Sequence, residues 1–411
     1  MLDIKYIQEN PEKVQEAALA KGITVSIGEL LDAEKEYREV FTQVQSLRAE
    51  RNAAAKSRDI EKGKEIKGKL EELEPRLAEL EEKVQTLLWN IPNPSKDDVK
   101  VGKDDSENEI IRKFGEPTTF SFKPRDHVEL GQMLDIIDIE RATKISGSRF
   151  YYLKNEGVLL EQALLRYALD TLLPQGFIPI LPPVLITEDT MKRLGYMENG
   201  GDEDMFRIEK DKLILVATAE QSIAPIHKDE TLDEDELPKR YVGYSPSFRR
   251  EAGSYGKDTR GILRVHQFNK VEMVSFVKKG EDDKEHEFLL GIEEKFFQEL
   301  GIPYQVSKMC TGDLGFPAAR KYDIEAWIPT QEKYREVTSV STVTDFQSRR
   351  LNTKYKTKDG TEYVQILNGT AFSIGRPIIA ILENFQQEDG TVIIPEVLRQ
   401  YTGFDKISPK K

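Results

Sequence analysis

Two stretches near the N-terminus space apolar residues alternately three and four positions apart. This a/d spacing is typical of helices that pair as a coiled coil. A polar turn near Asp59 to Gly63 separates the stretches, so together they predict one antiparallel helical hairpin at about residues 27–90. Pro75 lies inside the second limb and is expected to kink it, because its ring clashes with the carbonyl four residues earlier. The expected seam consists of Leu30, Ala33, Tyr37, Val40, Val44 and Leu47, and of Ile66, Leu70, Leu73, Leu77, Leu80, Val84 and Leu87.

The charge of the hairpin tip is opposite to that of the whole chain. The chain carries −13, which by itself argues against a nucleic-acid partner, but residues 48–69 hold eight basic and four acidic side chains. A basic helix face is most often only solvated. Here the apolar seam stops at Arg51 and the basic residues gather where the two limbs meet, which favours a phosphate-binding surface. The candidate residues are Arg48, Arg51, Lys56, Arg58, Lys62 and Lys64.

Composition restricts the compartment and the domain plan. The single cysteine, Cys310, excludes an intrachain disulfide and fits a reducing compartment. The N-terminus lacks the basic and apolar regions of a signal peptide, and no apolar run reaches the roughly 18 residues of a membrane span. We therefore expect a cytoplasmic protein with no membrane contact. The polar, proline-containing run after Leu88 predicts an N-terminal domain at 1–100, a linker at 101–120 and a larger domain at 121–411.

The larger domain is predicted to be α+β, with a mixed antiparallel sheet flanked by helices. Few of its segments alternate strictly between strand and helix, which argues against a parallel sheet. Strands are expected at 212–218, 240–249 and 265–277, and helices at 157–173 and 291–300. The piece from Phe177 to Pro183 is rich in proline, so it should lie at a sheet edge or an interface. No glycine-rich phosphate loop is present, so ATP, if used, must be held by other residues.

Two arginine motifs offer such a phosphate site. Arg249 and Arg250 lie between Phe248 and Glu251 at the end of a predicted strand, and Arg376 precedes a helical run that begins at Pro377. A planar guanidinium grips phosphate with two hydrogen bonds, and a helix start attracts anions. A lone arginine is most often a surface ion-pair partner. Two such motifs in one domain favour phosphate binding.

With these motifs the chain resembles the class II aminoacyl-tRNA synthetases, and specifically the bacterial-like seryl-tRNA synthetase family with an N-terminal coiled-coil arm. The class motifs resemble the piece ending at Pro182-Pro183, the stretch 248–272 and the stretch 368–384. The marks of the serine-specific family are Thr218-Ala219-Glu220, the stretch 252–272 with Gly253, Tyr255, Gly256 and Asp258, and Arg335 to Ser339 followed by Asp345-Phe346-Gln347 and Arg349-Arg350.

The resemblance implies a role for each site residue. Catalytic residues would be Arg249, Arg376 and Glu336. Serine would be held by Thr218, Ala219, Glu220, Arg249, Glu272 and Thr370. ATP would be held by Arg249, Arg250, Glu251, Glu336, Val337, Thr338, Ser339 and Arg376. Mg²⁺ would accompany ATP at Glu336 and Ser339. No zinc is expected, because the one cysteine and the histidines His127, His227, His266 and His286 are scattered.

The resemblance also implies a reaction and partners. ATP would activate L-serine to seryl-adenylate, and the seryl group would pass to the 3′-terminal ribose of serine tRNA, whose long variable arm meets the basic tip. A selenocysteine tRNA is a further candidate substrate. The proline-rich motif implies a homodimer. Two alternatives stay open: a catalytically dead RNA-binding or scaffold protein, and a class II ligase for another amino acid.

Overall fold

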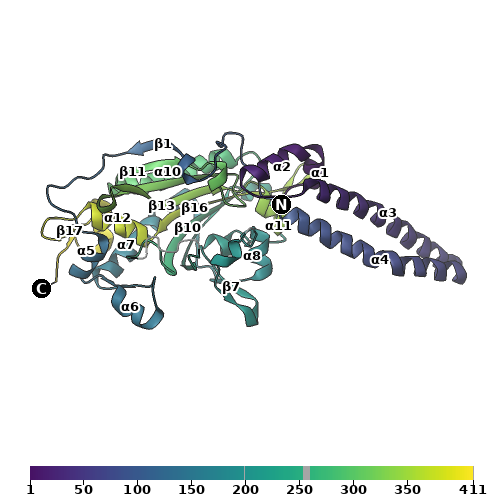
Figure 1. Ribbon diagram of the computed structural model, residues 1–411, viewed down its shortest axis with the longest axis horizontal. Coiled ribbons are helices and arrows are strands. Elements are labelled where there is room, and N and C mark those ends of the chain that lie inside the picture. Colours follow the sequence, from purple (N-terminus) through teal and green to yellow (C-terminus); the bar gives the residue numbers. More distant parts are fainter. Residues whose placement is uncertain (199, 253–259, 411) are drawn as a thin grey trace. The chain divides into compact units, whose positions relative to one another are not determined.

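The computed structural model describes residues 1–198, 200–252 and 260–410. The chain divides into two compact units, Met1–Pro94 and Ser95–Lys411 (Figure 1). Among the helices of these residues, none combines the length and the apolarity that a membrane span requires.

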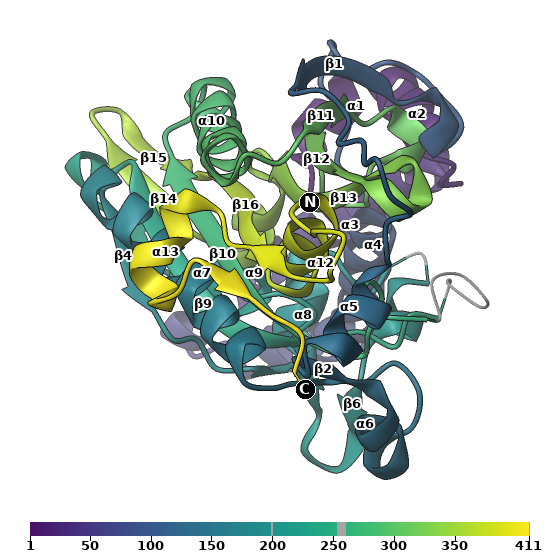
Figure 2. The same cartoon turned by 90° about the vertical axis from the view of Figure 1, so that its left-hand side faces the viewer.

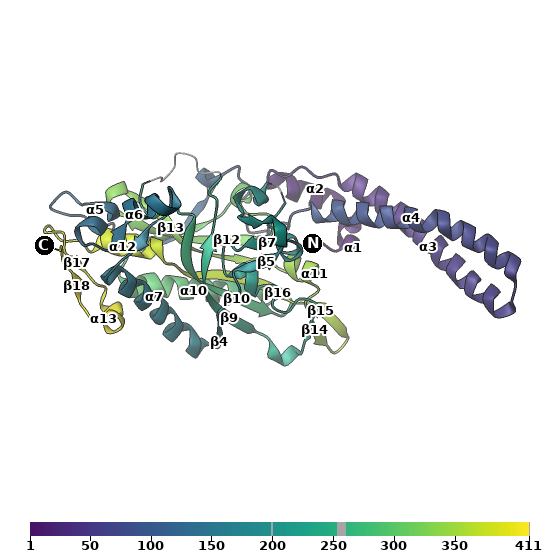
Figure 3. The same ribbon diagram turned by 90° about the horizontal axis from the view of Figure 1, so that it is seen from below.

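The N-terminal unit consists of four helices, α1 (Ile4–Glu9), α2 (Pro11–Ala20), α3 (Ile27–Ser57) and α4 (Ile60–Trp89). The predicted antiparallel hairpin is confirmed by α3 and α4 (Figures 1 and 3). Its turn is Arg58-Asp59 and not the predicted Asp59 to Gly63. Arg58 takes a left-handed conformation at φ 59°, and the Asp59 carboxylate accepts a hydrogen bond from the Lys62 amide, so α4 starts early. Pro75 lies inside α4, and the chain is helical on both sides of it.

Every member of the predicted seam of the hairpin is buried or partly buried, and the buried members are Leu30, Ala33, Val44, Ile66, Leu70 and Leu80. Val44, Ala54, Ile66 and Leu70 form its core cluster, and Val40, Leu47, Leu73 and Leu77 pack against them. Three ion pairs join the two limbs, Glu29 with Lys83, Glu36 with Arg76, and Arg48 with Glu74.

The larger unit is built on an eight-stranded sheet, which confirms the predicted α+β class. The strand order is β1-β11-β12-β13-β16-β10-β9-β4, and every neighbouring pair is antiparallel except β4 with β9. In that order the strands are Glu109–Phe114, Tyr304–Lys308, Arg320–Ile328, Lys333–Thr342, Gln365–Ser373, Gln267–Val277, Lys239–Phe248 and Phe177–Ile180. The proline-containing β4 lies at the end of the sheet, as expected of a strand with Pro179 in it.

The expected linker at 101–120 needs correction, because it contains strand β1. Glu109 pairs with Lys308 and Phe114 with Tyr304 of β11. All six residues of β1 are exposed, so the strand shows no alternation of apolar and polar residues from which it could be predicted. The segment is therefore part of the sheet and not a free connection.

Helices α7 (Glu156–Leu172) and α10 (Asp282–Leu300) pack on one face of the sheet (Figure 2). Tyr167, Phe296 and Phe372 form an aromatic cluster between them, with ring centroids 4.8–6.2 Å apart. A Cβ atom on Gly369 of β16 would lie 2.9 Å from Glu293 of α10. Gly369 therefore faces α10, and its neighbour Thr370 faces the opposite side, because side chains alternate along a strand.

Smaller elements complete the larger unit. They are α5 (His127–Met133), β2 (Ile137–Asp138), α6 (Ile139–Ser146), β3 (Tyr152–Leu153), β5 (Leu185–Thr187), α8 (Glu188–Leu194), β6 (Arg207–Ile208), β7 (Leu213–Leu215), α9 (Glu220–Ile223), β8 (Thr231–Leu232), α11 (Phe346–Leu351), β14 (Lys354–Thr357), β15 (Gly360–Tyr363), α12 (Gly375–Asn384), β17 (Val392–Ile393), α13 (Glu396–Thr402) and β18 (Lys406–Ile407). Among them, α13 packs on α7 and α10.

Candidate active site

Two adjoining pockets share Arg249, Lys270 and Ser339 as lining residues. The first pocket is also lined by residues that were predicted from the sequence, namely Glu251, Glu336, Val337, Thr338, Thr370 and Arg376. The second has a volume of about 390 Å³ and takes Thr218 and Glu220. Strands β9, β10, β13 and β16 and the first turn of α12 thus bring together most of the predicted site residues.

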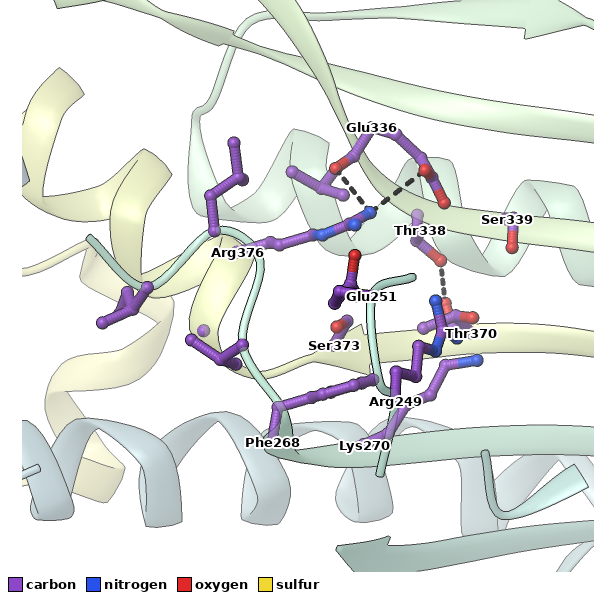
Figure 4. Close-up of a pocket in the computed structure, with 15 residues that line it drawn as sticks. Arg249, Glu251, Phe268, Lys270, Glu336, Thr338, Ser339, Thr370, Ser373 and Arg376 are labelled. Carbon is purple, nitrogen blue, oxygen red and sulfur yellow. Dashed lines mark hydrogen bonds and ion pairs between the residues drawn. The ribbon is translucent and has the colours of Figure 1, made fainter. Parts of the chain in front are cut away.

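The two arginines predicted to bind phosphate, Arg249 and Arg376, both line the first pocket (Figure 4). Arg376, in the first turn of α12, directs its guanidinium at Glu336 of β13: its Nη1 donates to the Glu336 carbonyl at 3.0 Å and lies 3.1 Å from the carboxylate. Arg249 follows β9, with its guanidinium 5.2 Å from the centre of the Phe268 ring and its Nε donating to the Ala217 carbonyl at 3.4 Å. Both cations therefore have fixed positions before any ligand enters.

The Glu336 carboxylate is held in its charged form. Partial removal from water would raise its pKa, but the positive charges of Arg376, Lys321 and Arg249 lower it well below its ordinary value. The side chain is still 42% exposed, so it can reach a ligand. Glu336 and Ser339 offer two oxygen donors at the pocket wall. That donor set suits Mg²⁺, which keeps several waters and binds through one or two carboxylates plus substrate phosphates.

A buried chain of polar contacts connects three of the residues predicted to bind serine, Thr218, Glu272 and Thr370. Lys270 Nζ lies 2.6 Å from Glu272 Oε2 and donates to Thr218 Oγ1 at 3.1 Å. Thr370 Oγ1 donates to Glu272 Oε2 at 3.3 Å, and the Thr338 hydroxyl donates to the Thr370 carbonyl. Glu272 is 1% exposed and lines neither pocket, whereas its ion-pair partner Lys270 lines both. In this structure the ammonium of Lys270 thus stands where the sequence predicted a contact with serine.

Glu220 is the second buried carboxyl among the residues predicted to bind serine. It opens α9 and is 4% exposed. Burial and the nearby charge of Glu272 raise the pKa of Glu220 to about 7. An entering ammonium would offset both effects, because it brings the opposite charge into a site with little water.

Some predicted residues lie elsewhere. Ala219 is fully buried and lines neither pocket. The guanidinium of Arg250 lies over Phe206, 5.7 Å from the ring centre, beside a separate hollow. Gly253, Tyr255, Gly256 and Asp258 lie outside the described residues.

The lining residues that were not predicted to have a role include Lys270, Phe268 and Tyr196. Lys270 stands two positions before Glu272, and residues two apart share one face of a strand, so the pattern was present in the sequence. Phe268 belongs to the same motif. Tyr196 comes from the distant turn after α8, and no local pattern connects it to the site.

The basic tip residues differ in their surroundings. Arg51, Lys56, Arg58, Lys62 and Lys64 are exposed. Arg48 is half-buried and ion-paired with Glu74 at 2.9 Å, so it also has a structural role between the limbs. Lys64 has only a long contact with Glu61, 3.7 Å.

The larger unit combines an antiparallel sheet with a pocket lined by arginines and carboxylates. Residues 205–385 match the class II core domain of the G, H, P, S and T tRNA synthetases. Fold, site and match together define a class II tRNA synthetase. Residues 1–94 match the seryl-tRNA synthetase N-terminal domain. A serine–tRNA ligase of Thermodesulfovibrio yellowstonii is 45% identical over 99% of this chain and 100% of its own. The chain belongs to the seryl-tRNA synthetase family, as the motifs predicted.

Solved structures agree over the full length. The crystal structure of seryl-tRNA synthetase from Pyrococcus horikoshii complexed with ATP is 42% identical, covers 100% of both chains and has a TM-score of 0.93. The cytoplasmic serine–tRNA ligase of Naegleria fowleri in complex with AMP is 31% identical, covers 100% of this chain and 99% of its own, and has a TM-score of 0.90.

Proposed function

We propose that this chain is an active serine–tRNA ligase. It joins ATP and L-serine to seryl-adenylate and pyrophosphate, and then transfers the seryl group to the 3′-terminal ribose of serine tRNA. The observation that carries the proposal is the junction of the two pockets at Arg249, with preset phosphate-binding cations on one side and a buried carboxylate pair on the other. ATP and AMP in the two related structures support a nucleotide in the first pocket.

Activation needs no protein nucleophile. The serine carboxylate oxygen attacks the α-phosphorus in line, and the bond to the β-phosphate oxygen breaks. Arg249 lies at the junction, where it can bridge the serine carboxylate and the α-phosphate, and Arg376 is placed for the γ-phosphate. Bound with ATP at Glu336 and Ser339, Mg²⁺ would neutralise phosphate charge. Catalysis therefore consists mainly of positioning and charge stabilisation.

Serine would enter the second pocket with its ammonium at Glu220 and its hydroxyl toward Glu272 and Thr370. Because Lys270 pairs with Glu272 in this structure, the hydroxyl has to share that carboxylate with Lys270. A site that hydrogen-bonds the hydroxyl rejects alanine strongly, because its buried polar groups would be left unpaired. Threonine must be excluded by the size of the pocket, which discriminates less strongly than the loss of a hydrogen bond does.

The N-terminal unit is proposed as the tRNA-binding domain, and the larger unit as the catalytic domain. The exposed basic residues of the tip would contact the phosphates of the tRNA variable arm. Such contacts recognise RNA shape and backbone more than base sequence. The expected location is the cytoplasm, where the single, buried Cys310 stays a thiol.

Serine-dependent exchange between ATP and labelled pyrophosphate tests the proposal. We expect exchange with serine and far less with alanine, glycine or threonine. No exchange with serine would favour a catalytically dead scaffold, and stronger exchange with another amino acid would favour a ligase of different specificity. Charging assays with serine tRNA and selenocysteine tRNA then test the second step.

A further inference from the structure

Tyr196 is a side chain of the amino-acid pocket for which the proposed reaction gives no role. It follows α8 (Glu188–Leu194) directly after Gly195, and it lines the same pocket as Thr218 and Lys270. Its hydroxyl donates a hydrogen bond of 2.6 Å to Oε1 of Glu220. A hydrogen bond to a carboxylate is stronger than one between neutral groups, so it both orients Glu220 and favours its charged form.

The turn that carries Tyr196 is fastened to α11 (Phe346–Leu351). The Arg350 side chain is fully buried, and its Nη1 donates to the Lys192 carbonyl at 3.1 Å and to Glu198 at 2.5 Å. The Gln347 amide donates to the Leu194 carbonyl at 3.1 Å. Tyr196 is thus held between two anchored neighbours.

Gly195 fixes the direction of the chain at this point. Its φ of +85° is a left-handed conformation, and an added Cβ atom would lie 3.1 Å from the Phe346 ring. A side chain at this position would strain the turn and press it away from α11. The turn therefore presents Tyr196 to the pocket in one direction.

The charges around Glu220 explain why a donor is needed there. Burial and Glu272 disfavour the Glu220 carboxylate, whereas Tyr196, Lys270 and Gln347 favour it. Lys270 is largely engaged by Glu272, at 2.6 Å. Gln347 contributes less than Tyr196, whose hydroxyl donates directly to Glu220 Oε1 at 2.6 Å.

We propose that Tyr196 is a positioning residue for the amino-acid substrate, which holds the Glu220 carboxylate ready to accept the serine ammonium. The proposal rests on the proposed function. Its consequence is a pH dependence: serine binding requires charged Glu220, so the serine KM rises as the pH falls through about 7, the pKa of Glu220. Without the tyrosine hydroxyl the pKa of Glu220 rises further, and the loss of binding begins at a higher pH.

The test is Tyr196→Phe, assayed by serine-dependent pyrophosphate exchange between pH 6 and 9. We expect about a tenfold higher serine KM at pH 7, the effect of one lost hydrogen bond to a charged group, with an unchanged ATP KM. The rise of the serine KM should start at a higher pH than in the wild type. Tyr167→Phe is the matched control: it removes a tyrosine–glutamate hydrogen bond to Glu299, far from the lining of either pocket, and should change neither KM.

A double-mutant cycle separates positioning from general loosening. In a Glu220→Gln background, Tyr196→Phe should have no further effect on the serine KM, because no charge is left to orient. A Tyr196→Phe enzyme with a wild-type serine KM and pH profile would overturn the proposal, as would equal rises in the serine and ATP KM. If the wild-type enzyme itself shows no serine-dependent exchange, the proposed function fails, which is a distinct result.

Discussion

Arg376 and Glu336 contact one another in the first pocket, where the arginine donates a 3.0 Å hydrogen bond to the Glu336 carbonyl and lies 3.1 Å from its carboxylate. The arginine proposed for the γ-phosphate is therefore held by the residue proposed for Mg²⁺. Because the two charges are opposite, each side chain orients the other.

Replacing Arg376 with alanine should slow adenylate formation. The transition state should lose roughly 3–4 kcal/mol of stabilisation, the effect of one preorganised donor. Serine binding should change little. Arg166→Ala is a suitable control, since Arg166 is exposed, lines neither pocket and pairs with Asp170 on the same helix. Near-normal pyrophosphate exchange by the Arg376 variant would remove that residue from the catalytic machinery.

Glu272→Ala should weaken the binding of serine much more than the binding of ATP. The carboxylate forms an ion pair with Lys270 and accepts a hydrogen bond from Thr370, both on the proposed amino-acid side. Glu272→Gln keeps the shape and should show an intermediate loss. The test is the KM for each substrate, and equal losses for serine and ATP would contradict a role of Glu272 in serine binding.

Glu293 of α10 should make stability depend on pH. It is fully buried, and neither of its carboxyl oxygens has a hydrogen-bond partner among the residues described. Burial and the nearby Glu272 raise the pKa of Glu293 well above its ordinary value. Because the folded-state pKa is the higher one, stability is fully present below the unfolded pKa of about 4.3 and is lost as the pH rises toward the folded pKa.

Glu293→Gln should therefore be more stable than the wild type at pH 8, by about 1–3 kcal/mol, with the gain shrinking toward pH 5. Urea denaturation at the two pH values measures the difference. Glu287→Gln, on the exposed side of the same helix, should show no such trend. A Glu293→Gln gain that does not depend on pH would contradict a buried charge as its cause.

The protein should be a homodimer. The edge strand β4 and the residue after it expose apolar side chains, Ile178 at 44% and Leu181 at 83%. A two-fold interface would cover such an edge in both copies. Light scattering at micromolar concentration should give about twice the chain mass of 47.1 kDa, and a value near one chain mass would contradict the prediction.

Deleting about Asp32 to Leu87 should abolish tRNA charging and leave serine-dependent pyrophosphate exchange largely intact. These residues belong to the N-terminal unit, whereas both pockets are lined by residues of the larger unit. Parallel exchange and charging assays on one preparation would show the difference. Loss of exchange together with charging would mean that the hairpin also supports the catalytic unit.

A milder variant replaces Arg51, Lys56, Arg58 and Lys62 with alanine. It should weaken tRNA binding and flatten the salt dependence, by roughly 0.7–0.9 in the log–log slope for each lost phosphate contact. Lys67→Ala with Lys69→Ala is the control, because these lysines already pair with Glu71 and Glu65. Normal charging with an unchanged slope would make the tip an ordinary solvated surface.

The sequence by itself determined the elements that depend on nearby residues. The heptad spacing predicted the helical hairpin, since residues three and four apart share a helix face whatever the rest of the chain does. The arginines of both motifs and most of their neighbours were also predicted, because each motif is a continuous strand-and-loop or strand-and-helix segment. Even there the capping contact of Asp59 moved the turn away from its expected position.

Only the tertiary structure decided which distant residues meet. β1 joins the sheet through hydrogen bonds to β11, nearly 200 positions later, although its exposed residues carry no periodicity. Lys270 pairs with Glu272 and reaches Thr218, and Tyr196 reaches Glu220 only because α11 anchors its turn. The strength of these contacts depends on burial and on the charges gathered around them. Both are properties of the packed chain, and neither can be calculated from the spacing of residues along it.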